Sequence, residues 1–152
     1  MRSASSGLEC VYMRDQENGQ FSADRPSVLV IDDEHAYTKV VAMVLGEYGF
    51  DSFPANSAED AWELLARITP DLVLLDVMMP EIDGITFLCE FRADAELRAI
   101  PVLVVTAYTE TREKAMSAGA SGYLKKPFSA QQLRDSISEF LSVQNPENPL
   151  FK

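Results

Sequence analysis

The sequence has little of several features that mark specialised classes of protein. Its 152 residues include only two cysteines, Cys10 and Cys89, which form no C-x-x-C pair, so neither a disulfide framework nor a cysteine zinc site is indicated. We expect Cys89 to be packed or half-buried in a helix. No apolar run approaches the length of a membrane-spanning helix, and the N-terminal stretch lacks the apolar core of a signal peptide. These absences predict a cytoplasmic protein with no membrane partner.

Basic residues are scarce relative to acidic ones. The 13 Lys and Arg residues face 24 Asp and Glu residues, which gives a net charge of -11. Such a charge repels phosphate backbones, so direct nucleic-acid binding by this chain alone is disfavoured. The one histidine, His35, is accompanied by no Gly-rich nucleotide-binding block, which argues against a kinase. We expect it to be solvated at the start of a helix.

The composition that remains is that of a globular domain. With 47% hydrophobic and 24% charged residues, the chain is large enough to bury a core without metals or disulfides. Residues 1–25 mix Ser, Gly, Gln and charged residues without periodicity, and we expect them to form a flexible extension. The folded domain should span residues 26–143, and residues 144–152 should form a flexible tail.

Short apolar runs without polar alternation predict buried strands. VLVI at 28–31, LVLL at 72–75 and VLVV at 102–105 suit strands that are covered on both faces. Two weaker strands are expected at 50–54 and 121–125. Strands covered on both faces belong to a parallel sheet with helices on each side, so the fold class is α/β.

Helical spacing and capping residues predict five helices that alternate with these strands. The first should stop at Gly49, and the last should open with a capping box of Ser129 and Gln132. The other three are expected from a capping box at Asn56 or Ser57 to before Pro70, from near Gly84 with Ile85, Leu88 and Phe91 buried, and over roughly residues 110–117.

Polar side chains stand where four of the strands end. Asp32 and Asp33 follow the first run, Asp76 the third, Thr106 the fourth, and Lys126 comes just after the fifth. The carboxyl ends of parallel strands share one edge of the sheet, where ligands bind. We therefore expect a pocket that holds three carboxylates, a hydroxyl and an ammonium.

Three converging carboxylates repel one another unless a cation compensates them. Ligands that are all oxygen favour Mg²⁺, which keeps several waters and is commonly shared with a phosphate. The hydroxyl and the ammonium are suited to neutralising a phosphoryl group during transfer. Asp76 is then the candidate nucleophile.

Four blocks, VLVIDDEH, LVLLDVMMPEIDG, VVTAY and GYLKKPF, resemble in order and spacing the response-regulator receiver domain of two-component signalling. The resemblance covers about residues 27–143 and is to a receiver of the chemotaxis kind. It implies a flavodoxin-like sheet of order 2-1-3-4-5. It also implies a phosphorylation-dependent switch, in which Asp76 accepts a phosphoryl group from a partner phosphohistidine with the help of Mg²⁺.

The same resemblance implies a ligand set for the metal. Asp33 and Asp76 would bind Mg²⁺ directly, Asp32 would act through a metal-bound water, and the backbone carbonyl of Met78 would supply a further ligand. Lys126 would pair with the phosphoryl oxygens, and its peptide bond to Pro127 is expected to be cis.

Four residues are expected to determine how the phosphorylated state switches the protein and how long that state lasts. Thr106 and Tyr123 are the implied switch residues, which would change the face of the fourth helix, fifth strand and fifth helix. Met78 and Tyr108 border the implied path of the hydrolytic water. Both are bulky, and they predict slow loss of the aspartyl phosphate.

The implied protein is no conventional enzyme, although it would catalyse its own phosphoryl transfer and slow autodephosphorylation. Its partners would be a histidine kinase or a histidine phosphotransfer protein in a phosphorelay, and a downstream target or effector; a homodimer is left open. The alternative is a phosphorylation-independent interaction module, a pseudo-receiver, which usually lacks one of the acids or the lysine. A haloacid-dehalogenase-like phosphatase requires D-x-D, and Glu34 stands where the second Asp is needed.

Overall fold

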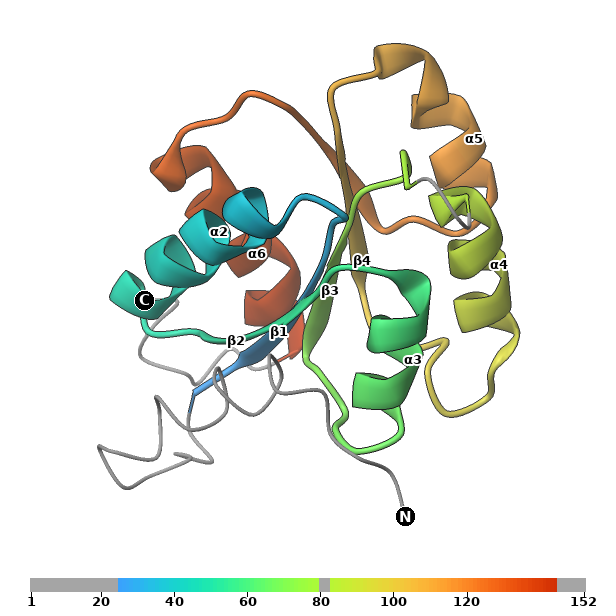
Figure 1. Ribbon diagram of the computed structural model, residues 1–152, viewed down its shortest axis with the longest axis horizontal. Helices are drawn as coiled ribbons and strands as arrows, with labels where there is room; N and C mark the ends of the chain where they lie inside the picture. The colour runs from blue at the N-terminus through green and yellow to red at the C-terminus, as the bar shows by residue number, and fades with distance from the viewer. Residues whose placement is uncertain (1–24, 80–82, 145–152) are drawn as a thin grey trace.

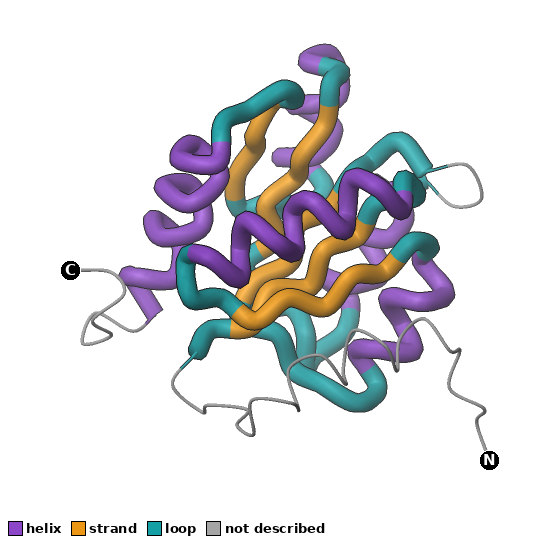
Figure 2. Tube along the Cα trace, turned by 60° about the vertical axis from the view of Figure 1, so that its left-hand side comes forward, coloured by secondary structure: helices purple, strands orange, loops and turns teal. Residues whose placement is uncertain are grey.

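A five-stranded parallel sheet between two layers of helices forms the structure (Figures 1 and 2). This computed structural model describes residues 25–79 and 83–144. The strand order is β2-β1-β3-β4-β5, with every neighbouring pair parallel, which confirms the flavodoxin-like arrangement. The strands are β1 (Ser27–Ile31), β2 (Asp51–Ala55), β3 (Leu72–Leu75), β4 (Val102–Thr106) and β5 (Gly122–Lys125).

Alternate residues of the strands build two separate cores. Leu29 and Ile31 of β1 pack under one layer of helices, whereas Val28 and Val30 pack under the other. Both faces of the sheet centre are buried because the runs 28–31 of β1, 72–75 of β3 and 102–105 of β4 are apolar throughout. The first layer contains α3 (Ala58–Leu65), α4 (Gly84–Ala93) and α5 (Arg112–Ser117), and the second contains α2 (His35–Glu47) and α6 (Ala130–Gln144).

The helix ends follow the expected capping signals. Gly49 has a φ of 86°, a left-handed conformation that suits glycine and terminates α2. Ser57 caps α3 by accepting a hydrogen bond from the Asp60 amide at 3.0 Å. His35 is the exposed first residue of α2, as expected.

A complete capping box opens α6. The Gln132 amide donates to Ser129 Oγ at 3.1 Å, and the Gln132 side chain accepts from the Ser129 amide at 2.8 Å. The box fixes the point at which the chain turns into α6, and therefore how the short segment after β5 approaches the sheet.

Some local predictions were wrong. The segment expected as one helix over 110–117 begins with a 3₁₀ turn, Thr109–Thr111, because the Thr111 hydroxyl donates to the Tyr108 carbonyl at 2.6 Å and tightens the chain there. In α4, Phe87 is fully buried and Ile85 only half-buried. Cys89 is exposed, because it lies on the outer side of that helix.

The expected extension and tail fall almost wholly outside the described residues. Only Arg25 of residues 1–25 is described, and α6 is followed as far as Gln144. The boundaries of the domain therefore stay predictions. Within the described ranges, none of the helices combines the length and the apolar character needed to cross a membrane.

Candidate functional site

The polar residues predicted at the ends of the strands meet at the carboxyl edge of the sheet. Asp32 follows β1, Asp76 follows β3, Thr106 ends β4 and Lys126 follows β5. Backbone pairing continues past the strands and fixes their register, because the Asp76 amide donates to the Ile31 carbonyl at 2.9 Å and the Lys126 amide to the Thr106 carbonyl at 3.0 Å. Residues almost a hundred positions apart are thus neighbours by virtue of the topology.

An acidic cluster forms the centre of this edge. Asp32, Asp33 and Asp76 each offer a carboxylate oxygen within 4.8 Å of the others. Asp32 and Asp76 are only 2% and 9% exposed, whereas Asp33 is open to solvent. An all-oxygen cluster with one open side matches the ligand chemistry of a hard divalent cation such as Mg²⁺.

One ammonium bridges two of these carboxylates. Lys126 Nζ lies 2.6 Å from Asp32 Oδ2 and 3.1 Å from Asp76 Oδ2. Burial lowers the pKa of Lys126, but its hydrogen bond to Asp32 and the charge of Asp76 outweigh burial and raise the pKa. A single positive charge against three carboxylates leaves the site negative, which favours a bound cation.

The pKa of the Asp76 carboxyl is raised above its ordinary value. Burial is the main cause and the charge of Asp32 adds to it, while the Met78 amide and Lys126 oppose both. The Met78 amide donates to Asp76 Oδ1 at 2.9 Å, and the Glu34 amide donates to Asp32 Oδ1 at 3.0 Å. These two bonds leave the Oδ2 atoms of both carboxylates directed at Lys126.

Asn56 supports the acidic pair from behind, a role that the sequence did not predict. Its Nδ2 donates to the backbone carbonyl of Asp32 at 2.9 Å and to the buried Thr38 hydroxyl at 3.0 Å. The sequence identified Asn56 only as one of two possible helix caps. Because Ser57 takes that role, the Asn56 side chain is available to link the end of β1 to α2 and to the loop after β2.

Gly84 lets the start of α4 approach the backbone that follows Asp76. Its amide donates to the Val77 carbonyl at 3.1 Å. A Cβ at this position would lie 2.4 Å from Val77 Cα and 2.7 Å from the Asp76 carbonyl oxygen. Only glycine fits such a close contact with backbone atoms, and the contact fixes the turn that carries Asp76.

The backbone of Tyr108 links the two predicted switch residues. Thr106 is fully buried, and its Oγ1 accepts from the Tyr108 amide at 3.3 Å. Tyr123 is half-buried, and its hydroxyl donates to the Tyr108 carbonyl at 2.9 Å. The Arg112 guanidinium lies 5.8 Å from the centre of the Tyr123 ring. A movement of Thr106 would therefore act on Tyr123 through one residue.

The two residues predicted to control hydrolysis have exposed side chains. Met78 is 51% exposed and Tyr108 is 48% exposed. Met78 also lines the same open pocket as Asp33. The geometry places both beside functional residues, and their effect on water stays a prediction.

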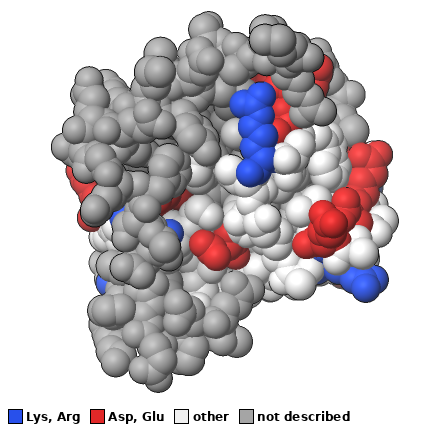
Figure 3. Space-filling model, turned by 90° about the horizontal axis from the view of Figure 1, so that it is seen from below, with Lys and Arg blue, Asp and Glu red and all other residues white. Residues whose placement is uncertain are grey.

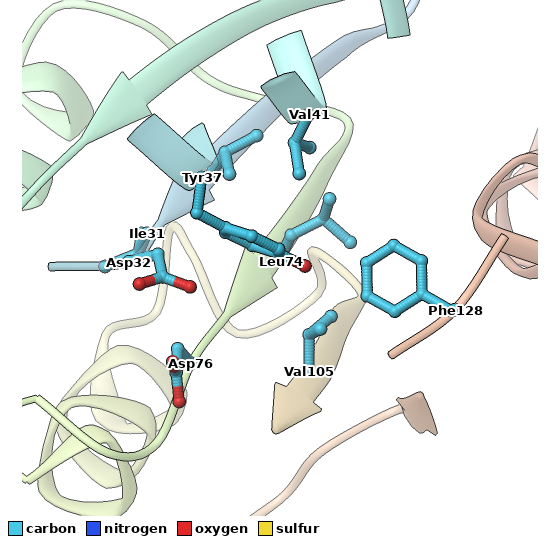
Figure 4. Close-up of a pocket in the computed structure, with 9 residues that line it drawn as sticks. Ile31, Asp32, Tyr37, Val41, Leu74, Asp76, Val105 and Phe128 are labelled. Carbon is cyan, nitrogen blue, oxygen red and sulfur yellow. The ribbon is translucent and has the colours of Figure 1, made fainter. Parts of the chain in front are cut away.

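Tyr37, in the first turn of α2, is a member of the site that sequence reasoning missed. Its ring faces Lys126, with Nζ 3.9 Å from the ring centre, and it lines a small pocket with Asp32 and Asp76 (Figure 4). Burial, followed by the negative charges of those carboxylates and of Glu34, raises the pKa of Tyr37, so the phenol stays neutral. The sequence alone gives Tyr37 only the helical spacing of an apolar residue, together with Val41 and Val44.

Comparison with known proteins agrees with this geometry. Residues 28–138 match the family described as the response regulator receiver domain. The regulatory protein AtoC of Escherichia coli is 38% identical over 120 residues, which cover 78% of this chain and 26% of AtoC. The chemotaxis protein CheY4 of Vibrio cholerae is similar in structure, with a TM-score of 0.73 and 25% identity over 76% of this chain and 98% of CheY4.

A third relative bears on the acidic cluster. The receiver domain of the sensor histidine kinase PA1611 from Pseudomonas aeruginosa superimposes with a TM-score of 0.72 and 25% identity, over 78% of this chain and 98% of that domain, and its structure has a magnesium ion coordinated in the active-site cleft. The chain described here belongs to the response regulator receiver domain family. It spans 26% of the length of AtoC and 54% of the length of the response regulator Rre1 of Synechocystis.

Proposed function

We propose that this receiver domain is a signalling switch that accepts a phosphoryl group on Asp76. The donor would be a phosphohistidine of a histidine kinase or of a histidine phosphotransfer protein. The observation that carries the proposal is the bridging ammonium: Lys126 Nζ lies 3.1 Å from Asp76 Oδ2 within a cluster of three carboxylates. No other described carboxylate is both beside this ammonium and at the end of the central strand β3.

The cluster has the ligands that Mg²⁺ requires. Asp33 and Asp76 would hold the ion through their carboxylates, Met78 through its backbone carbonyl, and Asp32 through a water. When bound, the ion supplies positive charge that offsets the negative charge of the phosphoryl oxygens. The protein supplies the alignment of Asp76, through the Met78 amide, and a second positive charge, from Lys126.

Phosphoryl transfer would proceed by displacement at phosphorus. A carboxylate oxygen of Asp76 forms a bond to phosphorus while the bond from phosphorus to the histidine nitrogen breaks, and that nitrogen keeps the electron pair and takes up a proton. The Met78 amide at 2.9 Å holds the other carboxylate oxygen during the step. Lys126 would then turn from Asp76 Oδ2 to the phosphoryl oxygens, which carry more negative charge.

The signal would leave the site through Thr106. When the Thr106 hydroxyl turns to a phosphoryl oxygen, the bond that it accepts from the Tyr108 amide at 3.3 Å is lost. The Tyr108 carbonyl, which holds the Tyr123 hydroxyl, is then free to move. The face made by α5, β5 and α6 would change, and with it the affinity for a downstream target or effector.

The alternative of a phosphorylation-independent module is not favoured. All three acids, the hydroxyl and the lysine are present and converge at one edge of the sheet. Burial of a carboxylate costs desolvation free energy, and a domain that no longer accepted a phosphoryl group would have no need to retain it.

Labelling with a small phosphodonor tests the proposal directly. Acetyl phosphate and Mg²⁺ should add one phosphoryl group to the chain, as detected by intact mass, and chelation of the metal should prevent it. Asp76→Asn should abolish the addition, while Asp135→Asn, an exposed carboxylate on α6, should leave it unchanged. Labelling of Asp76→Asn at the wild-type rate would contradict the assignment.

The same samples test the output face. Hydrogen exchange should change in α5, β5 and the start of α6 when labelling is complete, and should not change in Asp76→Asn treated in the same way. Identical exchange in the labelled and unlabelled wild-type protein would show that Thr106 and Tyr123 do not transmit the modification.

A further inference from the structure

Tyr37 takes no part in the transfer described above, yet it touches the lysine on which that transfer depends. We propose that Tyr37 is a positioning residue for Lys126, whose ammonium is held between the aromatic face and the two buried carboxylates. The inference rests on the proposed function, because it concerns the rate at which Asp76 accepts a phosphoryl group.

The ammonium has three neighbours on three sides. Asp32 Oδ2 lies at 2.6 Å, Asp76 Oδ2 at 3.1 Å and the centre of the Tyr37 ring at 3.9 Å. A cation at this distance from a ring face is attracted by the negative face of the π-system, and more strongly where water is excluded. The ring therefore prevents the ammonium from moving away from the acidic cluster towards α2.

The ring is itself held in place by its surroundings. The edge of Phe128 packs against it, with ring centres 6.3 Å apart and an interplanar angle of 81°. Leu74 and Val105 line the same pocket, and the ring extends into it from α2 with its hydroxyl end on the side of Leu74 and Phe128 (Figure 4). A ring fixed at its far end presents a constant face to Lys126.

The hydroxyl group does not account for the arrangement. The Tyr37 hydroxyl oxygen is buried and has no hydrogen-bond partner among the residues that the structure describes. A buried hydroxyl without a partner stabilises nothing, so the useful part of the side chain is the aromatic face. Phenylalanine would keep that face, whereas leucine would fill part of the volume and offer the ammonium no attraction.

Loss of the face should slow phosphorylation. Without it, the ammonium is free to settle against Asp32, its nearest carboxylate, and is less often placed to meet an incoming phosphoryl group. A cation–π attraction in a partly desolvated site corresponds to a change of about threefold to tenfold in rate. Tyr37→Leu should lose that factor in labelling by acetyl phosphate, and Tyr37→Phe should recover it.

A graded series separates the charge effect from packing. Phenylalanine with zero, one, two or three ring fluorines, placed at position 37 of the full chain, changes shape little and draws electron density from the ring face. The labelling rate at saturating Mg²⁺ should fall stepwise along the series. Tyr48→Leu is the matched control, because Tyr48 ends the same helix and lies 5.4 Å from the Arg134 guanidinium, remote from the site; its rate should equal that of the wild type.

The outcomes are distinct. A stepwise fall with fluorination, with thermal unfolding unchanged, supports the positioning role. Equal rates across the fluorinated series, or equal rates for Tyr37→Leu and Tyr37→Phe, overturn it while leaving Asp76 as the acceptor. A wild-type chain that takes no phosphoryl group overturns the proposed function, and the positioning role with it.

Discussion

Both ends of the sheet hold charged side chains, but the two ends differ in how many partners the protein offers to these charges. At the amino end, Arg92 of α4 donates to three carbonyl oxygens, those of Gly119 at 2.8 Å, Arg98 at 2.8 Å and Ile100 at 2.6 Å, and to the Ser121 hydroxyl at 3.1 Å. The guanidinium thus joins the segments that lead into β4 and β5. Figure 3 views the molecule from this end, where acidic and basic side chains both reach the described surface.

At the carboxyl end the charges are not balanced by the protein itself. The cluster holds three carboxylates, of which Asp32 and Asp76 share the ammonium of Lys126, and the buried Tyr37 hydroxyl has no partner within the described part of the chain. Proteins depart from full satisfaction of buried polar groups mainly where function requires it. The contrast teaches that the amino end is organised for stability, while the carboxyl end keeps negative charge that the proposed Mg²⁺ would compensate.

Removal of Arg92 should have the largest effect on stability. Arg92→Ala leaves its carbonyl acceptors without their donor, and we expect the free energy of unfolding to fall by about 2 to 4 kcal/mol. Urea unfolding followed by the fluorescence of Trp62 measures the loss. Arg98→Ala is the control, because that side chain is exposed, and its effect should stay within about 0.5 kcal/mol. If both variants are as stable as the wild type, the hydrogen bonds of Arg92 at the amino end do not contribute to stability.

Gly84→Ala should lower both stability and phosphoryl labelling, although Gly84 lies at the carboxyl end of the sheet alone. The new Cβ would overlap the backbone after Asp76, so the turn must shift, which should cost about 2 kcal/mol of stability and slow phosphoryl labelling. Gly46→Ala is the matched control, since a Cβ there meets nothing within 4 Å, and it should be neutral or slightly stabilising. A Gly84→Ala protein that labels at the wild-type rate would show that the turn tolerates the overlap.

Asp76→Asn should stabilise the metal-free protein in a pH-dependent way. Burial raises the pKa of Asp76 above its ordinary 3.8, so the folded state holds the proton to higher pH than the unfolded chain. The contribution of this carboxyl to stability is therefore present at low pH and lost as pH rises through its folded pKa. The variant should gain on the order of 1 kcal/mol at pH 7 and less at pH 4, close to the ordinary pKa, measured by urea unfolding with chelator. A gain that is equal at both pH values would contradict this explanation.

The sequence predicted the sheet well because its signals are local and strong. The apolar runs at 28–31, 72–75 and 102–105 have no polar residue to place on an open face, and the capping box at Ser129 is complete within four residues. Convergence of the polar residues on one edge then follows from parallel topology. The 3₁₀ turn at Thr109–Thr111 was missed because it depends on a single side-chain hydrogen bond that competes with the helix.

The parts of the site that were not predicted depend on packing between distant segments. Tyr37 has the helical spacing of a core residue, and only the approach of the segment after β5 places Lys126 over its ring. Asn56 carries an ordinary capping signal, and its bond to the Asp32 carbonyl appears only when β1 and β2 pair. Gly84 could be read as a helix start, but not as a contact with the backbone of Val77.

The smallest expected effect is on the lifetime of the phosphorylated state, which depends on the access of water to the carboxyl end of the sheet. Hydrolysis requires a water aligned opposite the bond from phosphorus to Asp76. The backbones of Met78 and Tyr108 are tied to the site, through Asp76 Oδ1 and Thr106 Oγ1, while their side chains are about half exposed at 51% and 48%. Bulky groups at these places obstruct water, and neither can orient it, so we expect slow loss of the phosphoryl group.

Substitution of both residues by polar side chains should admit and orient that water. Met78→Asn combined with Tyr108→Glu should speed decay by about threefold, equivalent to about 0.7 kcal/mol of barrier, and should leave Mg²⁺ affinity little changed because the Met78 backbone carbonyl is retained. Decay is measured by intact mass after removal of acetyl phosphate. Met43→Asn, a more exposed methionine on α2 at 68%, is the control and should decay like the wild type. Equal decay in all three proteins would mean that the bulk of these side chains does not limit the access of water.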